Sequence, residues 1–349
     1  MAQITEKEKN MASVFDSKYF NNAVFQKYLE TVPRTKTNAL LRSGVLRNRS
    51  DLKPLLADQV GGNYINVPII GRIGGDVLNY DGDTDITATG IGTFLQAMIV
   101  CGRAKAWQEK DFTQDITGKN FMEEIVGQVA NYWDDVDQAD LLAALAGIFG
   151  VTDDSFNTKN TLDITGETVK TVGPTTLNNV IQTAAGSNKN IFTLAIMHSQ
   201  IATNLENQQL LQYWKETDAN GIQRPTNLAS WSGRTVLIDD DVPVDTSGSD
   251  PVYTTYILGK GAIDFCDCGV KVPSETKRDA LTDGGVDMLI TRQRHLIAPR
   301  GFSYTDTSKI SPMASDLATA DNWALVTDSA GTGYYPTKAI PIARIKSLG

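Results

Sequence analysis

The sequence predicts an α+β fold that carries long extensions. Two strand-like runs, NYINVPI (63–69) and TFLQAMIVCGRAKAW (93–107), flank a connector rich in Gly and Asp. Residues 120–147 then show continuous helical periodicity, and strands mixed with shorter helices follow. A chain of 349 residues suggests two domains, or one domain with large extensions.

The first residues predict a mobile N-terminal arm. The segment MAQITEKEKN is polar and lacks the apolar stretch of a secretory signal. Helical spacing of four apolar residues predicts a helix that Pro33 ends: Val24, Phe25, Tyr28 and Leu29. A second short helix is expected at about 35–43, with Gly44 as its C-terminal cap.

The two strand-like runs predict a long β-hairpin. Its connector, residues 71–92, favours turns over a packed core, and a hairpin with little core of its own must lie on something else. Asp81, Asp83 and Asp85 match the first ligand positions of an EF-hand loop. Ile86 and Gly92 then break the pattern, so a solvated hairpin tip is preferred to a calcium site.

Residues 120–147 predict a spine helix roughly 42 Å long. Asn120 and Glu123 can form its capping box, and Gly147 and Gly150 end it. Its acidic residues form either a solvated stripe or a face that a basic surface of another subunit covers: Asp134, Asp135, Asp137 and Asp140.

The body of the chain predicts alternating helices and strands. Helices are expected from Pro174 and over 198–214, and a buried strand at 191–197. Long strands are expected at 254–272 and 286–304. In the tail after residue 306 we expect a short helix near 314–320 and a final strand, AIPIARI.

Composition excludes several functional classes. The net charge of −9 argues against a dedicated nucleic-acid binder, and three cysteines do not make a disulfide framework. No apolar run is long enough to span a membrane. With only His198 and His295, catalytic triads and multi-histidine metal sites are restricted. We expect His198 to assist a helix cap and His295 to be a satisfied strand histidine.

Cys266 and Cys268 share one face of a strand. Zinc would need two further ligands, so buried small residues are the preferred interpretation. Arg292 and Arg294 also point to one side of a strand. They can hold an anion, although ion pairs between strands or subunits are commoner.

No phosphate-binding loop, dinucleotide fingerprint, nucleophile elbow or HExxH motif is present. The nearest catalytic pattern is RTVLIDDDVP (234–243), in which Asp239 and Asp241 resemble a phosphatase-type nucleophile and Mg²⁺ ligand. The βα units that should follow are missing. A turn at the end of a core strand is therefore the preferred interpretation.

The ordered elements resemble the major capsid proteins of tailed bacteriophages, which have the Hong Kong 97-type fold. The segment VFQKYLETVPRTKTNALLRSGVL is similar to the family's arm, and GGNYINVPIIGRIGGD to the start of its extended loop. The segment GRAKAWQEKDFTQDITGKNFMEEIVGQVANYWDDVDQADLLAALAGIF is similar to the loop's return and the spine helix. The similarity covers most of residues 14–310, and the tail after about 310 matches least well.

The resemblance implies a division into four parts. These are an N-terminal arm (1–58), an extended β-hairpin loop (59–113), a peripheral domain (114–169 plus 254–298, with spine helix 120–147) and an axial domain (170–253 plus 299–349). The turn at 274–285 is expected where three capsomers meet. Hexamers and pentamers would form a procapsid that matures into an icosahedral virion shell around double-stranded DNA. Portal and scaffold proteins would be partners, and assembly would occur in the bacterial host cytoplasm.

The resemblance implies no enzyme activity, cofactor or metal. An encapsulin-like nanocompartment that loads protein cargo stays open as an alternative, and a metal-dependent phosphotransfer enzyme at Asp239 and Asp241 is the third.

Charge suggests which residues touch a neighbouring subunit. Residues 34–53 carry six basic side chains and one acid, Asp51, whereas the spine is acidic. We expect arm and spine faces of adjacent subunits to meet through many weak contacts. Reversing Arg42, Arg47 and Arg49 to Glu is expected to impair assembly while monomers stay folded. The candidate contact residues are Arg42, Arg47, Arg49, Arg72, Asp76, Arg103, Lys105, Asp134, Asp137, Lys277, Arg278, Arg292 and Arg294.

Overall fold

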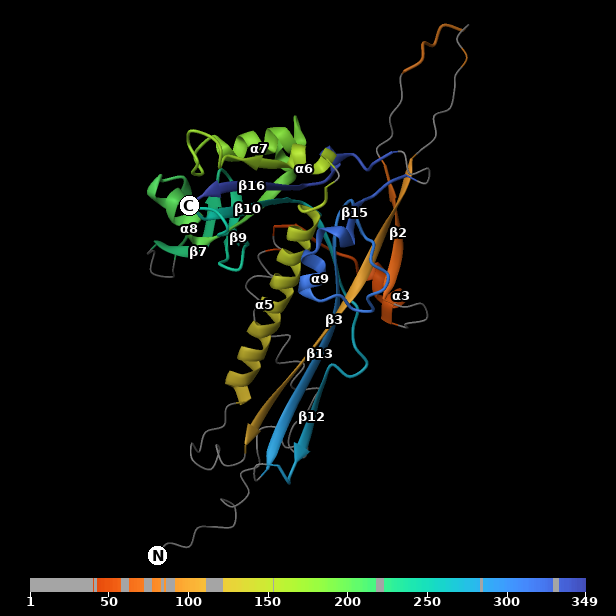
Figure 1. The fold of residues 1–349 in the computed structure, drawn as a ribbon, viewed down its shortest axis with the longest axis vertical. Helices are drawn as coiled ribbons and strands as arrows, with labels where there is room; N and C mark the ends of the chain where they lie inside the picture. The colour runs from red at the N-terminus through yellow and green to blue at the C-terminus, as the bar shows by residue number, and fades with distance from the viewer. Residues whose placement is uncertain are drawn as a thin grey trace, which may run out of the picture.

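The chain folds into an upper lobe and a long sheet that extends from it beside one helix (Figure 1). This computed structural model describes residues 40, 43–57, 63–71, 77–82, 85, 92–110, 122–152, 154–217, 223–282, 285–328 and 333–349. Both helices and strands contribute, which confirms the α+β class. None of the described helices combines the length and apolar character needed to cross a bilayer.

The lobe contains an eight-stranded mixed sheet in the order β4-β16-β10-β5-β8-β7-β6, with β9 beside β10. Helices α7 (Thr176–Ala185) and α8 (Ser199–Asn207) pack on one face, where Ile181 and Ile201 are fully buried. The strands are β4 (Thr161–Asp163), β5 (Phe192–Met197), β6 (Leu211–Thr217), β7 (Gln223–Trp231), β8 (Arg234–Ile238), β9 (Val244–Asp245), β10 (Val252–Gly259) and β16 (Ile342–Leu348).

The long sheet has the order β1-β11-β13-β3-β2, with β12 beside β13. The predicted hairpin is confirmed, because β2 and β3 pair antiparallel from Tyr64↔Ile99 to Ile70↔Thr93. Residues 100–110 of β3 pair with β13. The hairpin, which has little core of its own, therefore lies on the rest of the long sheet. The strands are β1 (Leu46–Asn48), β2 (Tyr64–Ile70), β3 (Thr93–Lys110), β11 (Ile263–Asp267), β12 (Ser274–Asp279) and β13 (Val286–Pro299).

The predicted spine helix is α5 (Met122–Ile148), which runs along the long sheet (Figure 1). Its expected capping residue, Asn120, lies outside the described residues. Leu141, Leu145 and Ile148 bury its inner face in a core shared by both sheets. Helix α9 (Ala314–Ala318), strand β14 (Phe302–Tyr304) and strand β15 (Trp323–Leu325) also contribute to this core. Short elements are η1 (Ser50–Leu52), α3 (Lys53–Ala57), α6 (Asp154–Asn160), η2 (Lys189–Ile191), η3 (Ala320–Asn322) and η4 (Thr337–Ala339).

Three predicted elements are wrong in extent. The strand expected over 286–304 ends at Pro299, and residues after the left-handed turn at Gly301 form β14 in a separate two-stranded sheet. The strand expected over 254–272 is two strands in different sheets, because the chain turns at Gly261, whose φ of 66° lies in the left-handed region. The helix expected over 198–214 ends at Asn207, and residues from Leu211 form strand β6. Gln209, with φ of 56°, turns the chain between them.

The tail has a defined place in the fold. The short helix expected near 314–320 is present as α9, and the final strand is present but shifted to Ile342–Leu348. That strand, β16, lies inside the eight-stranded sheet between β4 and β10. The last strand of the tail is therefore part of the core of the lobe, whereas α9 packs on α5.

Candidate functional site

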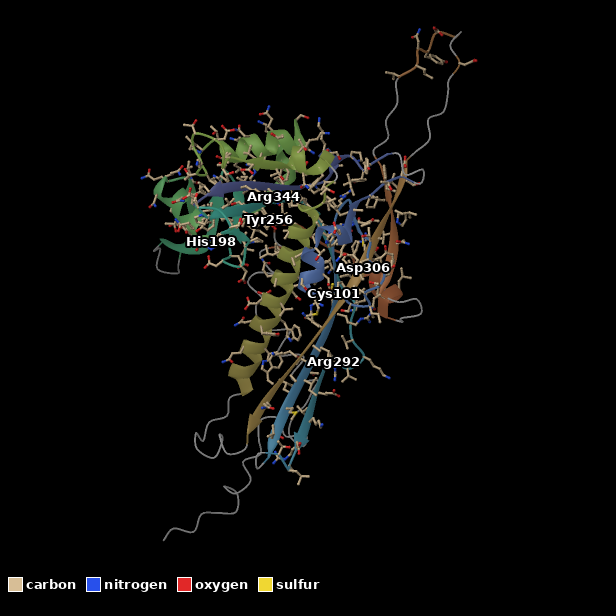
Figure 2. The ribbon with its side chains drawn as sticks, in the orientation of Figure 1. Cys101, His198, Tyr256, Arg292, Asp306 and Arg344 are labelled. Atoms are coloured by element: carbon tan, nitrogen blue, oxygen red, sulfur yellow. The ribbon has the colours of Figure 1, made fainter. Side chains whose placement is uncertain are left out.

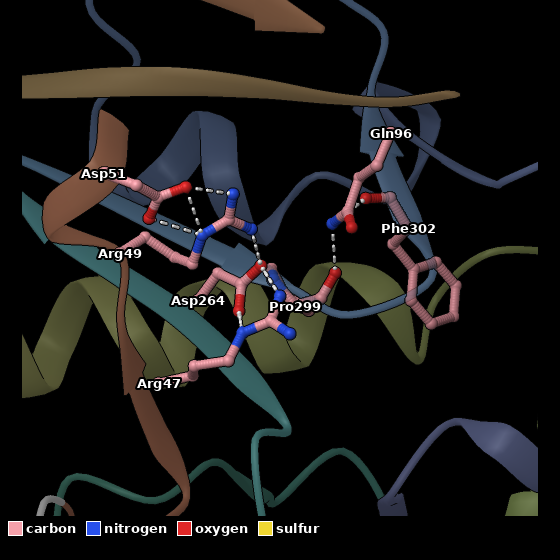
Figure 3. Close-up of polar contacts among 7 residues, drawn as sticks. All are labelled: Arg47, Arg49, Asp51, Gln96, Asp264, Pro299 and Phe302. Carbon is pink, nitrogen blue, oxygen red and sulfur yellow. Dashed lines mark hydrogen bonds and ion pairs between the residues drawn. The ribbon is translucent and has the colours of Figure 1, made fainter. Parts of the chain in front are cut away.

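The charged residues near the start of the described chain hold β1 against β11 (Figure 3). Arg47 donates from Nε to Oδ1 of Asp264 and from Nη2 to Oδ2, each at 2.6 Å. Arg49 bonds the same carboxylate from Nη1 at 3.3 Å and also pairs with Asp51. The hydrogen bond with Asp51 contributes most to the raised pKa of Arg49, although burial opposes it. The Asp264 side chain is 1% exposed, so the two arginines compensate a carboxylate that is removed from water.

These bonds change what is expected when arginines of the arm are replaced by Glu. Glu in place of Arg47 and Arg49 would surround Asp264 with carboxylates, so a monomer that stays folded is no longer expected. Arg42, Arg72 and Asp76 lie outside the described residues.

The acidic residues of α5 form a buried polar layer against β13 and β3. Asp140 accepts from Nη2 of Arg103 at 2.9 Å and lies 3.0 Å from Nε2 of His295. Asp137 accepts from Nε2 of Gln293 at 2.8 Å, and its Oδ1 lies 3.4 Å from Nδ1 of His295. The prediction of a satisfied strand histidine is confirmed for Nε2 of His295, whereas its buried Nδ1 makes no hydrogen bond among the described residues.

The prediction that the acidic residues of the spine form a solvated stripe is wrong for three of the four. Asp134, Asp137 and Asp140 are buried, and Asp135 alone among them is exposed. Polar partners on β13 and β3 explain how Asp137 and Asp140 can turn inward. Burial opposes ionisation of Asp140, but the hydrogen bonds from His295 and Arg103 outweigh it and lower the pKa of this carboxyl.

The hairpin of β12 and β13 carries four more candidate residues. Arg278 bonds the fully buried Asp287 at 2.8 Å, and Arg292 pairs with Glu275 across the two strands. Arg294 bonds Asn63 at 3.0 Å, whereas Lys277 is exposed, as is Lys105 on β3. Arg292 lies well down the long sheet, away from the lobe (Figure 2). All of these pairs lie within one subunit. A role of the candidate residues in contacts between subunits therefore stays a prediction.

The aspartates of RTVLIDDDVP have structural contacts where β8 ends. Asp239 accepts from the backbone N–H of Asp241 at 3.1 Å, and Asp240 accepts from that of Ser199 at 3.2 Å. His198 caps α8 by accepting from the N–H of Gln200 at 3.1 Å, as predicted. Among the described residues no group of His, Cys, Asp or Glu has the arrangement of a metal site.

The predicted burial of the cysteines is confirmed. Cys101, Cys266 and Cys268 are free thiols that are at most 1% exposed. Burial raises the pKa of Cys101 and of Cys268 to about 12. Thiols in this state are poor nucleophiles and poor metal ligands.

Two important polar residues were missed in the sequence. Gln96, fully buried on β3, donates from Nε2 to the carbonyls of Pro299 and Phe302 at 2.8 and 2.9 Å (Figure 3). Asp264 is the other. Its position in the largely apolar run GAIDFCDC could have indicated its role, because an acid that is buried with such a run requires a cation.

The sequence and the fold were compared with those of known proteins. No protein-family model matches the chain. The chain is 29% identical over 297 residues to the major capsid protein of Bacillus phage SPP1, covering 84% of this chain and 88% of that protein. This similarity supports a structural role in a phage capsid.

Solved structures of phage capsids confirm the Hong Kong 97-type fold of the chain. The capsid of Ralstonia phage GP4 matches with a TM-score of 0.59 at 10% identity, covering 88% of each chain. The capsid of cyanophage Pam1 matches with a TM-score of 0.53 at 11% identity, covering 91% of this chain and 93% of that one. The capsid of Helicobacter pylori bacteriophage KHP30 matches with a TM-score of 0.53 at 12% identity, covering 87% of each chain. The solved structures show the fold, and the similarity to the SPP1 protein supports a structural role in a phage head shell, where copies of the chain associate with one another.

Proposed function

We propose that the chain is a phage major capsid protein that forms hexamers and pentamers, which close into an icosahedral shell around double-stranded DNA. One observation carries this proposal: large apolar side chains are exposed on the extensions. Val77 and Tyr80 of the extended loop are 100% and 91% exposed, and Leu281 at the tip of the β12–β13 hairpin is 96% exposed. Thin extensions cannot bury such groups themselves, so neighbouring subunits would cover them.

The two sheets support the division into domains, with one change. The long sheet with α5 would be the peripheral domain, and the eight-stranded sheet with α7 and α8 the axial domain. Because β4 and β10 belong to the eight-stranded sheet, we propose boundaries near residues 150 and 260 in place of 169 and 254. The arm at 1–58 and the extended loop at 59–113 are retained.

The partners and place of assembly are part of the same proposal. Portal and scaffold proteins would join the shell in the host cytoplasm, and packaged DNA would touch its inner wall without sequence preference. We propose no catalytic role for Asp239 and Asp241, since Asp239 accepts the backbone N–H of Asp241 in the turn after β8. The phage relative favours a virion over an encapsulin-like compartment.

Negative-stain electron microscopy of the chain expressed alone tests this proposal. Shells, tubes or capsomers are expected. Leu281→Asp should reduce assembled particles at least tenfold by placing a charge in a covered contact, and Leu281→Met should preserve them. A wild-type chain that remains monomeric at high concentration would contradict the proposal.

A further inference from the structure

The outer side of α5 carries a second apolar stripe. Its residues recur at alternating steps of four and three positions: Tyr132, Val136, Ala139, Ala143 and Ala146. This is the spacing with which one helix receives another. The opposite side of the same helix is already buried against the sheets by Trp133, Leu141 and Leu145.

This stripe forms the floor of a groove of about 480 Å³. Asp241 and Pro243, which follow β8, form part of the wall, and Ala318 at the end of α9 contributes to the lining. Asp135, Asp240 and Asp241 make the surroundings acidic, and all three are exposed. The groove therefore suits an occupant with bulky apolar residues on one face and basic residues near them.

One segment of the chain has that character. Residues 20–32, FNNAVFQKYLETV, place Phe25, Tyr28 and Leu29 at helical spacing, and these large groups complement the small alanines of the groove. Lys27, Arg34 and Lys36 supply positive charge in and just after the segment, against one acid, Glu30. The extended loop fits less well, because its exposed Val77 and Tyr80 precede Asp81, which the acidic groove would repel.

We propose that the groove on α5 binds residues 20–32 of a neighbouring subunit as an amphipathic helix. This inference rests on the proposed shell-building function and names one of its contacts. It replaces the expected meeting of Arg47 and Arg49 with the spine, because those arginines bond Asp264 in their own subunit. The apolar part of the arm, with Lys27 beside it, makes the contact.

A disulfide between two copies tests the proposal. Chains carrying Phe25→Cys are co-expressed with chains carrying Ala143→Cys, assembled and oxidised. A covalent dimer is expected on a non-reducing gel, because the three native cysteines are buried and do not compete. Asp250→Cys, on an exposed loop, replaces Ala143→Cys as the control and should give no dimer. Intact shells without a dimer would overturn the inference while leaving the shell-building function standing.

The double variant Phe25→Cys/Ala143→Cys in one chain identifies the source of the segment. Covalent ladders are expected, whereas crosslinking only within one chain would overturn docking between neighbours.

As a second measurement, Asp135→Lys should lower particle yield at least fivefold, and adding Lys27→Glu to it should restore most of the yield. Asp135→Lys should keep the unfolding midpoint of the unaltered chain, because residue 135 is exposed and lies on the outer face of α5. Equal yields from Asp135→Lys and the double charge swap would contradict the contact.

Discussion

Arg47 donates two hydrogen bonds of 2.6 Å to the carboxylate of Asp264, from a position 217 residues earlier in the chain. Arg49 contacts the same carboxylate at 3.3 Å. The pairing fixes β1, at the start of the described chain, to its neighbour β11 at the edge of the long sheet.

Replacing both arginines tests the strength of this link. The double variant Arg47→Ala/Arg49→Ala should lower the free energy of unfolding by about 3–5 kcal/mol, because the buried Asp264 loses its cations. Chemical denaturation measures the loss. Lys53→Ala is the control: its 3.6 Å pair with Asp267 is exposed on both sides and should contribute less than about 1 kcal/mol. Equal effects would show that Asp264 needs no cation.

Acid should weaken the polar layer under α5. The folded-state pKa of Asp140 lies below its ordinary value of 3.8, so its contribution is fully present above pH 3.8. That contribution is lost as the pH falls through the folded-state pKa. Asp140→Asn should therefore be less stable than the unaltered chain near neutral pH and should approach it in stability below pH 3.8, in denaturation curves at several pH values. Asp250→Asn, on an exposed loop, should leave the pH profile unchanged.

Gly147→Ala should destabilise the protein although alanine favours helices. An added Cβ would lie 2.2 Å from the carbonyl oxygen of Leu317 and 2.6 Å from Nε1 of Trp323. Overpacking of this kind costs about 1–3 kcal/mol, which exceeds the gain in helix propensity of about 1 kcal/mol. Thermal unfolding followed by tryptophan fluorescence measures the change. Gly166→Ala, where a Cβ meets nothing within 4 Å, should be nearly neutral.

Gln96→Leu should cost about 2 kcal/mol or more, because it removes the donor to two carbonyls at the turn between β13 and β14. Gln108→Leu makes the same chemical change at an exposed position of the same strand and should have little effect on unfolding. Similar losses in the two variants would mean that the turn does not depend on Gln96.

The thiols should be unreactive until the chain unfolds. Cys101, Cys266 and Cys268 are buried and their pKa values are raised, so a thiol reagent at pH 8 should label none of them in the folded protein. All three should react in denaturant. Rapid labelling of the folded chain would show that the core around β11 opens.

Features that depend on neighbouring residues could be predicted from the sequence. His198 caps a helix through a residue two positions away, and α5 follows from its own periodicity. The Hong Kong 97-type fold was expected from the resemblance of the ordered segments to a known family, without any single diagnostic motif.

Features that depend on distant residues could not be predicted in this way. The stripe of Asp137 and Asp140 resembles a solvated face until His295 and Gln293 are placed opposite it. The run 254–272 alternates suitably for one strand, and only the left-handed turn at Gly261 sends its halves into two sheets. The candidate contacts between subunits depend on a second copy, which no intramolecular pattern specifies.

The position of β16 means that the sheet of the lobe can be completed only after the last residues of the chain have been synthesised. During synthesis, residues 161–163 and 252–259 emerge long before residues 342–348, yet β16 must lie between them. A nascent chain short of residue 342 therefore leaves β4 and the adjoining edge of β10 unjoined. The lobe closes only when this late strand is inserted, so a partly synthesised chain lacks the finished lobe that a shell subunit presents to its neighbours.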